Sequence, residues 1–264
     1  MVVAAGGLGT RVHRWDRYLP KEWQSVGGRP GIVHLLKEIA DLGPAHVVIV
    51  YHPYYEAFVA WAREVLSLDG HQRYVGAAGL ALSDDPLPHE MTVDWVRQCG
   101  SYGDLTSVLN GADRLAGPET SNSGELWLAF GDNLYPASNP LATLRQSAPG
   151  VAVLARPYQP KPAQERGVIA TVRDAGGALM VELVEKPDPY AAQALEERYG
   201  PDNLMMLEGR ARVDDTFLDC ARTNLAASSG EPRLSLALAA YARTSTVRVV
   251  STTGEIVDLG TPTG

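Results

Sequence analysis

A glycine-rich loop follows the first apolar run of the sequence, Val2-Val3-Ala4-Ala5. The loop reads Gly6-Gly7-Leu8-Gly9-Thr10-Arg11, and Lys21 stands ten residues after that arginine. Glycines at the end of a strand let the backbone come close to a ligand, and successive N–H groups there can bind anionic oxygens. Arg11 adds a forked cation that fits a phosphate, and Lys21 adds a point charge. This arrangement predicts a triphosphate site; the alternative is a tight turn with two surface cations.

Two aspartates each follow an apolar stretch. Asp132 comes after Leu126-Trp127-Leu128-Ala129-Phe130-Gly131, and Asp258 follows Val257. Open α/β sheets bind ligands at the carboxyl ends of their strands, and Mg²⁺ prefers hard oxygen ligands that it shares with substrate phosphates. The two carboxylates therefore predict a magnesium site facing the triphosphate loop. The alternative is that both are ordinary turn residues at strand ends.

Two further segments carry side chains suited to a sugar phosphate and to a base. In Glu185-Lys186-Pro187 the glutamate suits diol binding and the lysine neutralises an incoming phosphate; a solvated ion pair before a proline is the alternative. The amide of Gln98, five residues before Gly103, can both donate to and accept from the edge of a pyrimidine. Because uracil and thymine present the same edge, this pair cannot separate UTP from dTTP. A strand-end glutamine and a helix-start glycine are the alternative.

Taken in chain order, these segments resemble the sugar-1-phosphate nucleotidyltransferases, especially the glucose-1-phosphate uridylyl- and thymidylyltransferases. The family's G-x-G-T-R loop, the P-K that follows it by about ten residues, and its G-D-N, E-K-P and D-x-G-T motifs all have counterparts here. The resemblance implies catalytic roles for Arg11, Lys21 and Lys186, and Mg²⁺ on Asp132 and Asp258. It implies nucleotide contacts from Ala5, Gly6, Gly7, Gly9, Thr10, Gln98 and Gly103, and sugar contacts from Gly167, Glu185 and Asn203.

The sequence departs from the family pattern in two places, both on the sugar side. Glu165-Arg166-Gly167-Val168 resembles the family's E-R-Y-G-V-V segment but lacks its tyrosine. The interval between Asn203 and Gly209 is one residue longer than in the family's N-[LY]-A-x-x-G-x-Y, and the tyrosine after the glycine is absent. The sugar could therefore differ from glucose.

The implied reaction joins a pyrimidine nucleoside triphosphate to a sugar 1-phosphate, giving a nucleoside-diphosphate sugar and pyrophosphate. UTP is the favoured triphosphate, with dTTP next, and glucose 1-phosphate is the favoured sugar phosphate. Alternatives are a cytidylyl- or adenylyltransferase acting on an unusual sugar phosphate, or a catalytically silent homologue that binds nucleotide sugars and regulates a partner. The resemblance also implies a homodimer or homotetramer.

The elements that must position these residues change in character along the chain. Apolar runs such as 46–51 and 126–130 alternate with helical patterns such as 32–42 and 103–115, which predicts parallel strands connected by helices. Beyond residue 151, strand patterns around 174–177 and 253–254 predict two antiparallel hairpins. We expect an α/β fold of the Rossmann-like, GT-A type: a mixed, mostly parallel sheet flanked by helices. It forms a single domain over 1–264, with a nucleotide-binding half (1–150) and a sugar-phosphate-binding half (151–264).

The bulk composition excludes several other classes of protein. Among 264 residues the net charge is −8, which argues against broad nucleic-acid binding because that usually needs a basic surface. Two cysteines are too few for a disulfide scaffold and indicate a cytoplasmic protein. No apolar run approaches the ~20 residues that span a bilayer. The scattered histidines make a zinc site unexpected, and the short first strand suggests that related proteins extend a few residues further at either end.

Overall fold

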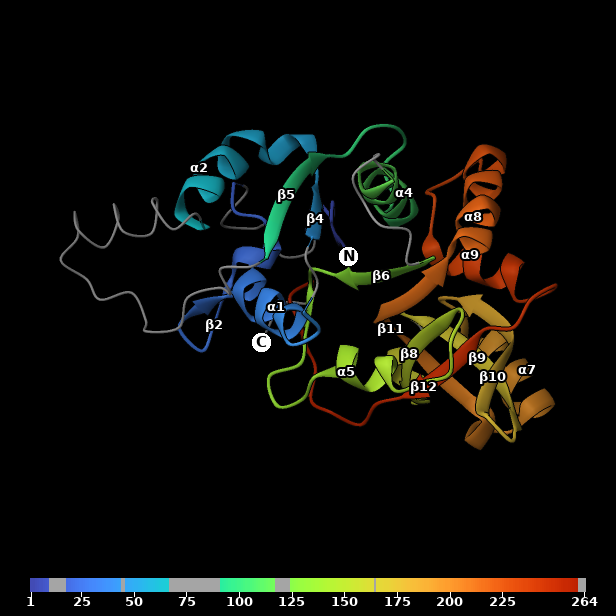
Figure 1. The fold of residues 1–264 in the computed structure, drawn as a ribbon. Helices are drawn as coiled ribbons and strands as arrows, with labels where there is room; N and C mark the ends of the chain where they lie inside the picture. The colour runs from blue at the N-terminus through green and yellow to red at the C-terminus, as the bar shows by residue number, and fades with distance from the viewer. Residues whose placement is uncertain (10–17, 44–45, 67–90, 117–123, 164, 261–264) are drawn as a thin grey trace.

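The computed structural model contains a nine-stranded mixed sheet that runs through both halves of the chain (Figure 1). It describes residues 1–9, 18–43, 46–66, 91–116, 124–163 and 165–260. The strands of the sheet are β1 (Val2–Ala5), β4 (His46–Tyr51), β5 (Thr92–Arg97), β6 (Glu125–Phe130), β8 (Ala152–Pro157), β9 (Gly167–Asp174), β10 (Gly177–Glu185), β11 (Leu204–Asp214) and β12 (Arg248–Ser251). Their order across the sheet is β5-β4-β1-β6-β11-β8-β12-β10-β9.

The remaining elements connect or cover these strands. The α-helices are α1 (Gly31–Ala40), α2 (Glu56–Leu66), α4 (Asp104–Leu115), α5 (Pro140–Arg145), α6 (Pro160–Ala163), α7 (Pro189–Tyr199), α8 (Asp215–Ala227) and α9 (Leu234–Tyr241). The 3₁₀ turns are η1 (Lys21–Trp23), η2 (Pro53–Tyr55) and η3 (Pro201–Asn203), and two small two-stranded sheets pair β2 (Ser25–Val26) with β3 (Arg29–Pro30) and β7 (Asn133–Leu134) with β13 (Val257–Asp258).

The four strands β5, β4, β1 and β6 are parallel, and the two inner strands β4 and β1 are buried on both faces. Successive residues of a strand point to opposite faces, and the packing follows this rule. Val48 and Val50 of β4 pack with α4 in one apolar cluster, whereas Val47 and Ile49 pack with α1 in the other. The continuous apolar run of 46–51 is explained by these two cores.

The rest of the sheet is mostly antiparallel and carries α7, α8 and α9. The predicted hairpin at 174–177 is confirmed, because β9 and β10 pair antiparallel with Gly177 opposite Asp174. The mixed α/β class is also confirmed, but the parallel ladders are confined to β5-β4-β1-β6 and to β8–β12, so the parallel share is smaller than expected. The reason is β11, which is antiparallel to both of its neighbours β6 and β8.

The second predicted hairpin, at 253–254, is wrong. β12 is hydrogen-bonded on both edges, to β8 and β10, so no edge is left for the segment that follows it. The chain leaves the sheet after Ser251, and β13 pairs instead with β7, with Asp258 opposite Asn133. This long-range pairing brings the end of the chain to the carboxyl end of β6.

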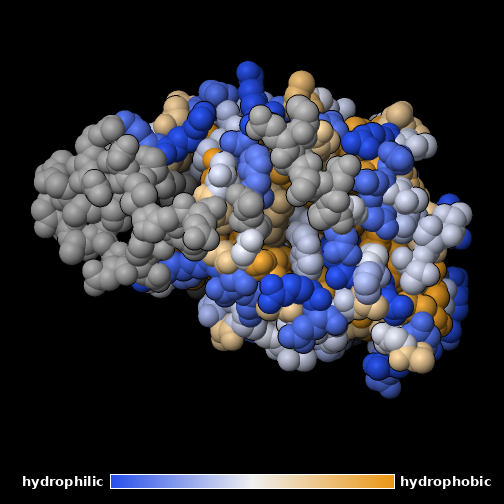
Figure 2. Space-filling view, in the orientation of Figure 1, coloured by the Kyte–Doolittle hydropathy of each residue, from blue (hydrophilic) through white to orange (hydrophobic). Residues whose placement is uncertain are grey.

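The surface drawn in Figure 2 is mainly hydrophilic over the described residues, with apolar residues in smaller patches. Within the described ranges, no helix is both long and apolar enough to cross a membrane.

Candidate active site

Lys21, Asp132 and Asp258 converge on one glycine, and we call these three residues the Lys21 cluster. The Lys21 ammonium contacts Oδ2 of Asp132 directly. A Cβ atom placed on Gly260 would lie 3.1 Å from Asp258 Oδ1, 3.5 Å from Asp132 Oδ2 and 3.8 Å from Lys21 Nζ. Three charged side chains from three distant parts of the sequence therefore surround a space that a single methyl group would fill.

Backbone hydrogen bonds hold the two aspartates side by side. Asp132 follows β6 directly, and its carbonyl oxygen accepts a hydrogen bond of 2.8 Å from Leu259 N. On the other segment, Gly260 N donates to Asp258 Oδ1 at 2.8 Å. The β7–β13 pairing fixes the register of the two segments, and this keeps the backbones of the two aspartates side by side.

The glycine loop lies against the Lys21 cluster. A Cβ atom on Gly7 would come within 2.9 Å of Lys21 Nζ, so only a glycine leaves the lysine where it is. The loop is fastened at Leu8, whose carbonyl oxygen accepts from the Tyr55 hydroxyl at 3.1 Å and whose N–H donates to the Tyr102 hydroxyl at 3.3 Å. Gly9 has a left-handed φ of 59°, which favours glycine.

Of the other residues predicted to bind the nucleotide in this loop, the structure describes Ala5 but not Thr10 and Arg11. Ala5 is the buried last residue of β1.

The Lys21–Asp132 pair is held in its ionised form. Burial alone would lower the pKa of Lys21, but the ion pair with Asp132 outweighs this effect and raises that pKa. Burial would likewise raise the pKa of Asp132, and Lys21 lowers it instead. Glu22 is different, since burial raises the pKa of its carboxyl to about 8 and its Oε2 has no hydrogen-bond partner within the described part of the chain. At neutral pH this carboxyl is mostly protonated.

The side chain of Gln98 is bound to the protein itself. It is buried, its Nε2 donates to Ser101 O and Gly103 O at 3.3 Å each, and its Oε1 accepts from Ser107 Oγ at 2.9 Å. A Cβ atom placed on Gly6 would lie only 2.2 Å from Gln98 Oε1, so the glycine is needed for this close contact. The amide that we expected to contact a base therefore orders the loop between β5 and α4 beneath the glycine loop.

Gly103 has a packing reason of its own. A Cβ atom there would lie 2.3 Å from Pro232 O. The glycine thus permits the segment before α9 to approach the start of α4.

Gly167, Glu185 and Lys186 lie together where β9 begins and β10 ends. Gly167 is the register partner of Glu185, and Glu185 Oε1 accepts from Arg233 Nη1 at 2.8 Å. Lys186 is exposed and has a left-handed φ of 46°, the only such value outside glycine in the described ranges. Strained backbone of this kind is often found at functional sites.

Asn203 does not join this group. Its Nδ2 donates to Tyr199 O at 2.8 Å and its carbonyl oxygen accepts from Thr171 Oγ1 at 3.0 Å. Thr171 stands four residues beyond Gly167 on β9, which is about 13 Å along a strand. The Asn203 amide closes the end of α7 instead.

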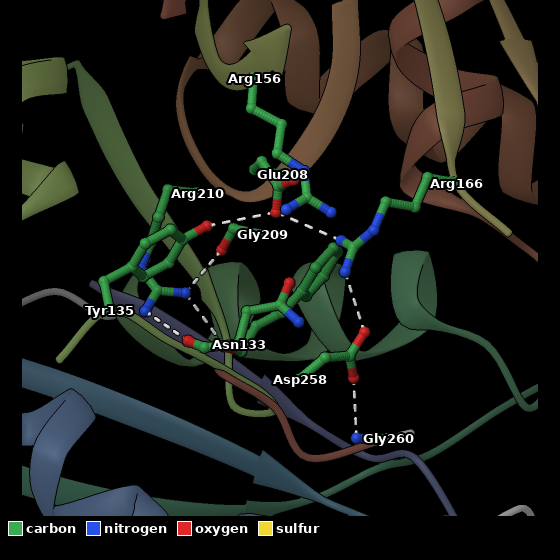
Figure 3. A network of polar contacts seen from close by, with 10 residues as sticks. Asn133, Tyr135, Arg156, Arg166, Glu208, Gly209, Arg210, Asp258 and Gly260 are labelled. Atoms are coloured by element: carbon green, nitrogen blue, oxygen red, sulfur yellow. Dashed lines mark hydrogen bonds and ion pairs between the residues drawn. The ribbon is translucent and has the colours of Figure 1, made fainter. Parts of the chain in front are cut away.

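Motif spacing did not select three charged residues, Arg156, Arg166 and Glu208, of which Arg166 connects Glu208 to Asp258 (Figure 3). Arg166 Nη2 donates to Asp258 Oδ2 at 2.9 Å and its Nη1 to Glu208 Oε2 at 3.2 Å. Arg156 Nε lies 2.8 Å from Glu208 Oε1 as an ion pair without hydrogen-bond geometry. We call Arg156, Arg166 and Glu208 the arginine pocket.

Two members of the arginine pocket, Arg166 and Glu208, lie at the two places where the sequence departs from the family pattern. Arg166 directly precedes Gly167, where the tyrosine is missing. Glu208 lies in a β-bulge of β11, where Leu207 pairs with Ala155 and Ala211 with Val153. Between these two pairs, three residues of β11 (208–210) stand against the single Leu154 of β8, so the register is irregular at Glu208. Glu208 directly follows the apolar run Leu204-Met205-Met206-Leu207, and a carboxylate at that place was the signal that could have identified it.

A buried ion pair supports the loop that carries Asp132. The Arg210 side chain is fully buried, and it donates to Glu38 Oε1 at 2.9 Å and Oε2 at 2.7 Å. It also donates to Phe130 O at 3.1 Å and to Asn133 O at 2.8 Å. Arg210 therefore holds the residues on either side of Asp132 and is a positioning residue.

The Lys21 cluster fits a divalent cation of the magnesium type. Its donor set is two carboxylates around the space at Gly260, and Mg²⁺ is usually bound by one or two carboxylates plus substrate phosphates. No group of three acidic, histidine or cysteine ligands occurs within the described ranges, so an all-protein cage is not what these residues offer.

Comparisons with known proteins identify the fold. No protein-family model and no curated protein matches the sequence. Among solved structures, a UDP-glucose pyrophosphorylase in complex with UDP-glucose matches with a TM-score of 0.75 and 18% identity, over 98% of this chain and 92% of that one. The UTP-bound enzyme from Acinetobacter baumannii matches with a TM-score of 0.71 and 20% identity, over 98% and 88%. A candidate glucose-1-phosphate thymidylyltransferase from Bacillus anthracis matches at 0.68 and 15%, over 98% and 89%. The chain thus has the GT-A-like nucleotidyltransferase fold.

Proposed function

We propose that this protein is a sugar-1-phosphate nucleotidyltransferase that uses a pyrimidine nucleoside triphosphate, with UTP favoured over dTTP. The observation that carries the proposal is the convergence of Lys21, Asp132 and Asp258 at Gly260, beside the glycine loop. Structural neighbours with the same fold were solved with UTP and with UDP-glucose, and this supports a nucleotide at the glycine loop. Glucose 1-phosphate is the favoured sugar phosphate, and other sugar phosphates are compared with it.

In the proposed reaction, an oxygen of the sugar phosphate attacks the α-phosphorus in line. The bond to the bridging oxygen of the β-phosphate breaks, and pyrophosphate leaves. No protein nucleophile is needed because the attacking phosphate is already anionic. The barrier consists mainly of charge repulsion and alignment, which fixed cations and positioning lower.

Each charged residue has a role in this scheme. The backbone of the loop and Arg11 bind the β- and γ-phosphates, Lys21 neutralises charge at the α-phosphate, and Lys186 orients the sugar phosphate. Lys21 stays charged because it is paired with Asp132, which raises the pKa of the lysine. Asp132 and Asp258 would hold Mg²⁺, which when bound supplies further neutralisation between the two reacting phosphates.

Pyrophosphate release tests the proposal directly. Glucose 1-phosphate with Mg²⁺ is incubated with UTP, dTTP, CTP, ATP or GTP in turn, and turnover with UTP and dTTP is the expected result. Turnover only with CTP or ATP would replace the pyrimidine assignment by a cytidylyl or adenylyl one. Tight binding of UDP-glucose without turnover under any condition would instead indicate a silent, regulatory relative.

A further inference from the structure

The arginine pocket lies where the sugar ring of the acceptor belongs, if the proposed function holds. A sugar 1-phosphate must place its phosphate at the Lys21 cluster and its ring toward Gly167 and Glu185. Arg166 connects the two places, because its backbone directly precedes Gly167 and its guanidinium reaches Asp258 Oδ2 at 2.9 Å. Ring substituents of the acceptor are therefore within reach of the pocket.

The charges inside the pocket do not balance. Two guanidinium groups share the one carboxylate of Glu208, whose side chain is fully buried while those of Arg156 and Arg166 are 25% and 16% exposed. Burial raises the pKa of Glu208 although both arginines attract its charge. Asp258, the second partner of Arg166, is also one of the two carboxylates proposed to hold Mg²⁺.

The guanidinium of Arg156 has N–H donors that make no hydrogen bond to the described residues. Its Nε faces Glu208 Oε1 without making a hydrogen bond, and its terminal nitrogens have no partner among the described residues. Guanidinium groups bind planar anions with two parallel hydrogen bonds. A partly buried cation without enough counter-charge is costly, and an anionic ligand would remove that cost.

We propose that the arginine pocket selects a sugar 1-phosphate that carries a second anionic group on its ring, such as the carboxylate of a hexuronic acid. The spare donors of Arg156 and Arg166 bind this group, and Glu208 keeps the two guanidiniums close together. A neutral hexose leaves the excess positive charge unmatched and is the poorer acceptor.

The test compares three acceptors with UTP and Mg²⁺: glucose 1-phosphate, glucuronic acid 1-phosphate and glucose 1,6-bisphosphate. We expect kcat/KM for one of the two doubly anionic acceptors to exceed that for glucose 1-phosphate by about tenfold to hundredfold, the usual range for a hydrogen-bonded charge. The better of the two identifies the second anion as a carboxylate or a phosphate. Equal or higher kcat/KM for glucose 1-phosphate overturns the inference and leaves the proposed function intact.

Variants of Arg156 test whether the arginine pocket causes the preference for a doubly anionic acceptor. In Arg156→Gln the preference ratio should collapse, and in Arg156→Lys, which keeps the charge, part of it should return. Arg145→Gln is the matched control, since Arg145 is exposed on α5 and has no partner in the described part of the chain. An unchanged ratio in Arg156→Gln contradicts the inference.

Calorimetric titration measures the affinity of the protein for each of the three sugar phosphates, and this measurement does not require turnover. If no acceptor releases pyrophosphate with any triphosphate, the proposed function fails. Binding of a doubly anionic acceptor at least about ten times tighter than that of glucose 1-phosphate still supports the pocket, and equal binding overturns it.

Discussion

Asp258 and Asn133 are register partners across the small β7–β13 sheet, and this pairing places Asp258 beside Asp132, more than a hundred residues away in the sequence. The two carboxylates enclose the space at Gly260 together with Lys21. The proposed chemistry depends on this arrangement, because both carboxylates would hold the cation, which when bound would supply charge neutralisation to the substrate phosphates.

Replacement of Asp258 by asparagine keeps the shape of the side chain and removes one charge from the proposed cation site. We expect Asp258→Asn to lower kcat by about 10²–10³-fold and to raise the Mg²⁺ concentration that gives half-maximal rate. Titration of the rate with Mg²⁺ measures both effects. Asp202→Asn, at an exposed position without a partner among the described residues, is the control; equal behaviour of the two variants would remove Asp258 from the site.

A methyl group at Gly7 should disturb the lysine without unfolding the protein. The Cβ would lie 2.9 Å from Lys21 Nζ, the end of a flexible side chain, which can move aside but then leaves Asp132. A misplacement of about 1 Å typically costs about 10²-fold in rate, and we expect that loss for Gly7→Ala. Gly230→Ala is the control because nothing lies within 4 Å of its Cβ position. Full activity of Gly7→Ala would show that the loop does not constrain Lys21.

The Arg210–Glu38 pair should matter for stability as well as for the site. Arg210→Met leaves the nearly buried Glu38 carboxylate (8% exposed) without its partner, which typically costs about 3–5 kcal/mol. Urea denaturation measures the loss, and the double variant Arg210→Met/Glu38→Met should recover part of it. The exposed pair Arg222–Asp113 offers the comparison, since removal of such a pair changes the free energy of unfolding by about 0–1 kcal/mol. Similar losses at both pairs would contradict the structural role of Arg210.

The buried carboxyl of Glu22 predicts a pH-dependent stability difference. Its pKa is raised from 4.5 to about 8 in the folded state, so between these values the folded state binds more protons than the unfolded state. Stability contributed by this group therefore falls as pH rises through this window and is constant above it, with a slope of at most about 1.4 kcal/mol per pH unit. Glu22→Gln removes the effect, so its free energy of unfolding relative to the wild type should rise from pH 5 to pH 8. A difference that stays constant over this range would show that Glu22 does not titrate there.

Local sequence patterns predict the elements well because they depend on near neighbours. The alternation of Val47, Val48, Ile49 and Val50 between two cores explains why a continuous apolar run forms a central strand. The residue types and spacing of Gly7, Lys21 and Asp132 likewise indicate a site for an anion and a cation, because Gly7 and Asp132 follow apolar runs and Lys21 lies a short interval after the glycine loop.

Contacts between segments that are distant in the sequence cannot be predicted from local patterns in the same way. Thr253-Gly254 has the residue types of a local hairpin turn, but the neighbours of β12 are strands distant in the sequence. The internal hydrogen bonds of Gln98 and the ion pairs of Arg166 with Asp258 and Glu208 also join separate segments. The bulge at 207–211 shifts the register of β11 against β8, so motif spacing alone cannot assign the position of Glu208.

The central claim is that Lys21, held between the glycine loop and the two aspartates, neutralises charge at the transferred phosphate. Pyrophosphate release by Lys21→Ala, compared with the wild type at saturating UTP, glucose 1-phosphate and Mg²⁺, tests it most directly. We expect Lys21→Ala to lose about 10²–10³-fold in kcat and its circular dichroism spectrum to match that of the wild type. Turnover equal to that of the wild type would contradict it.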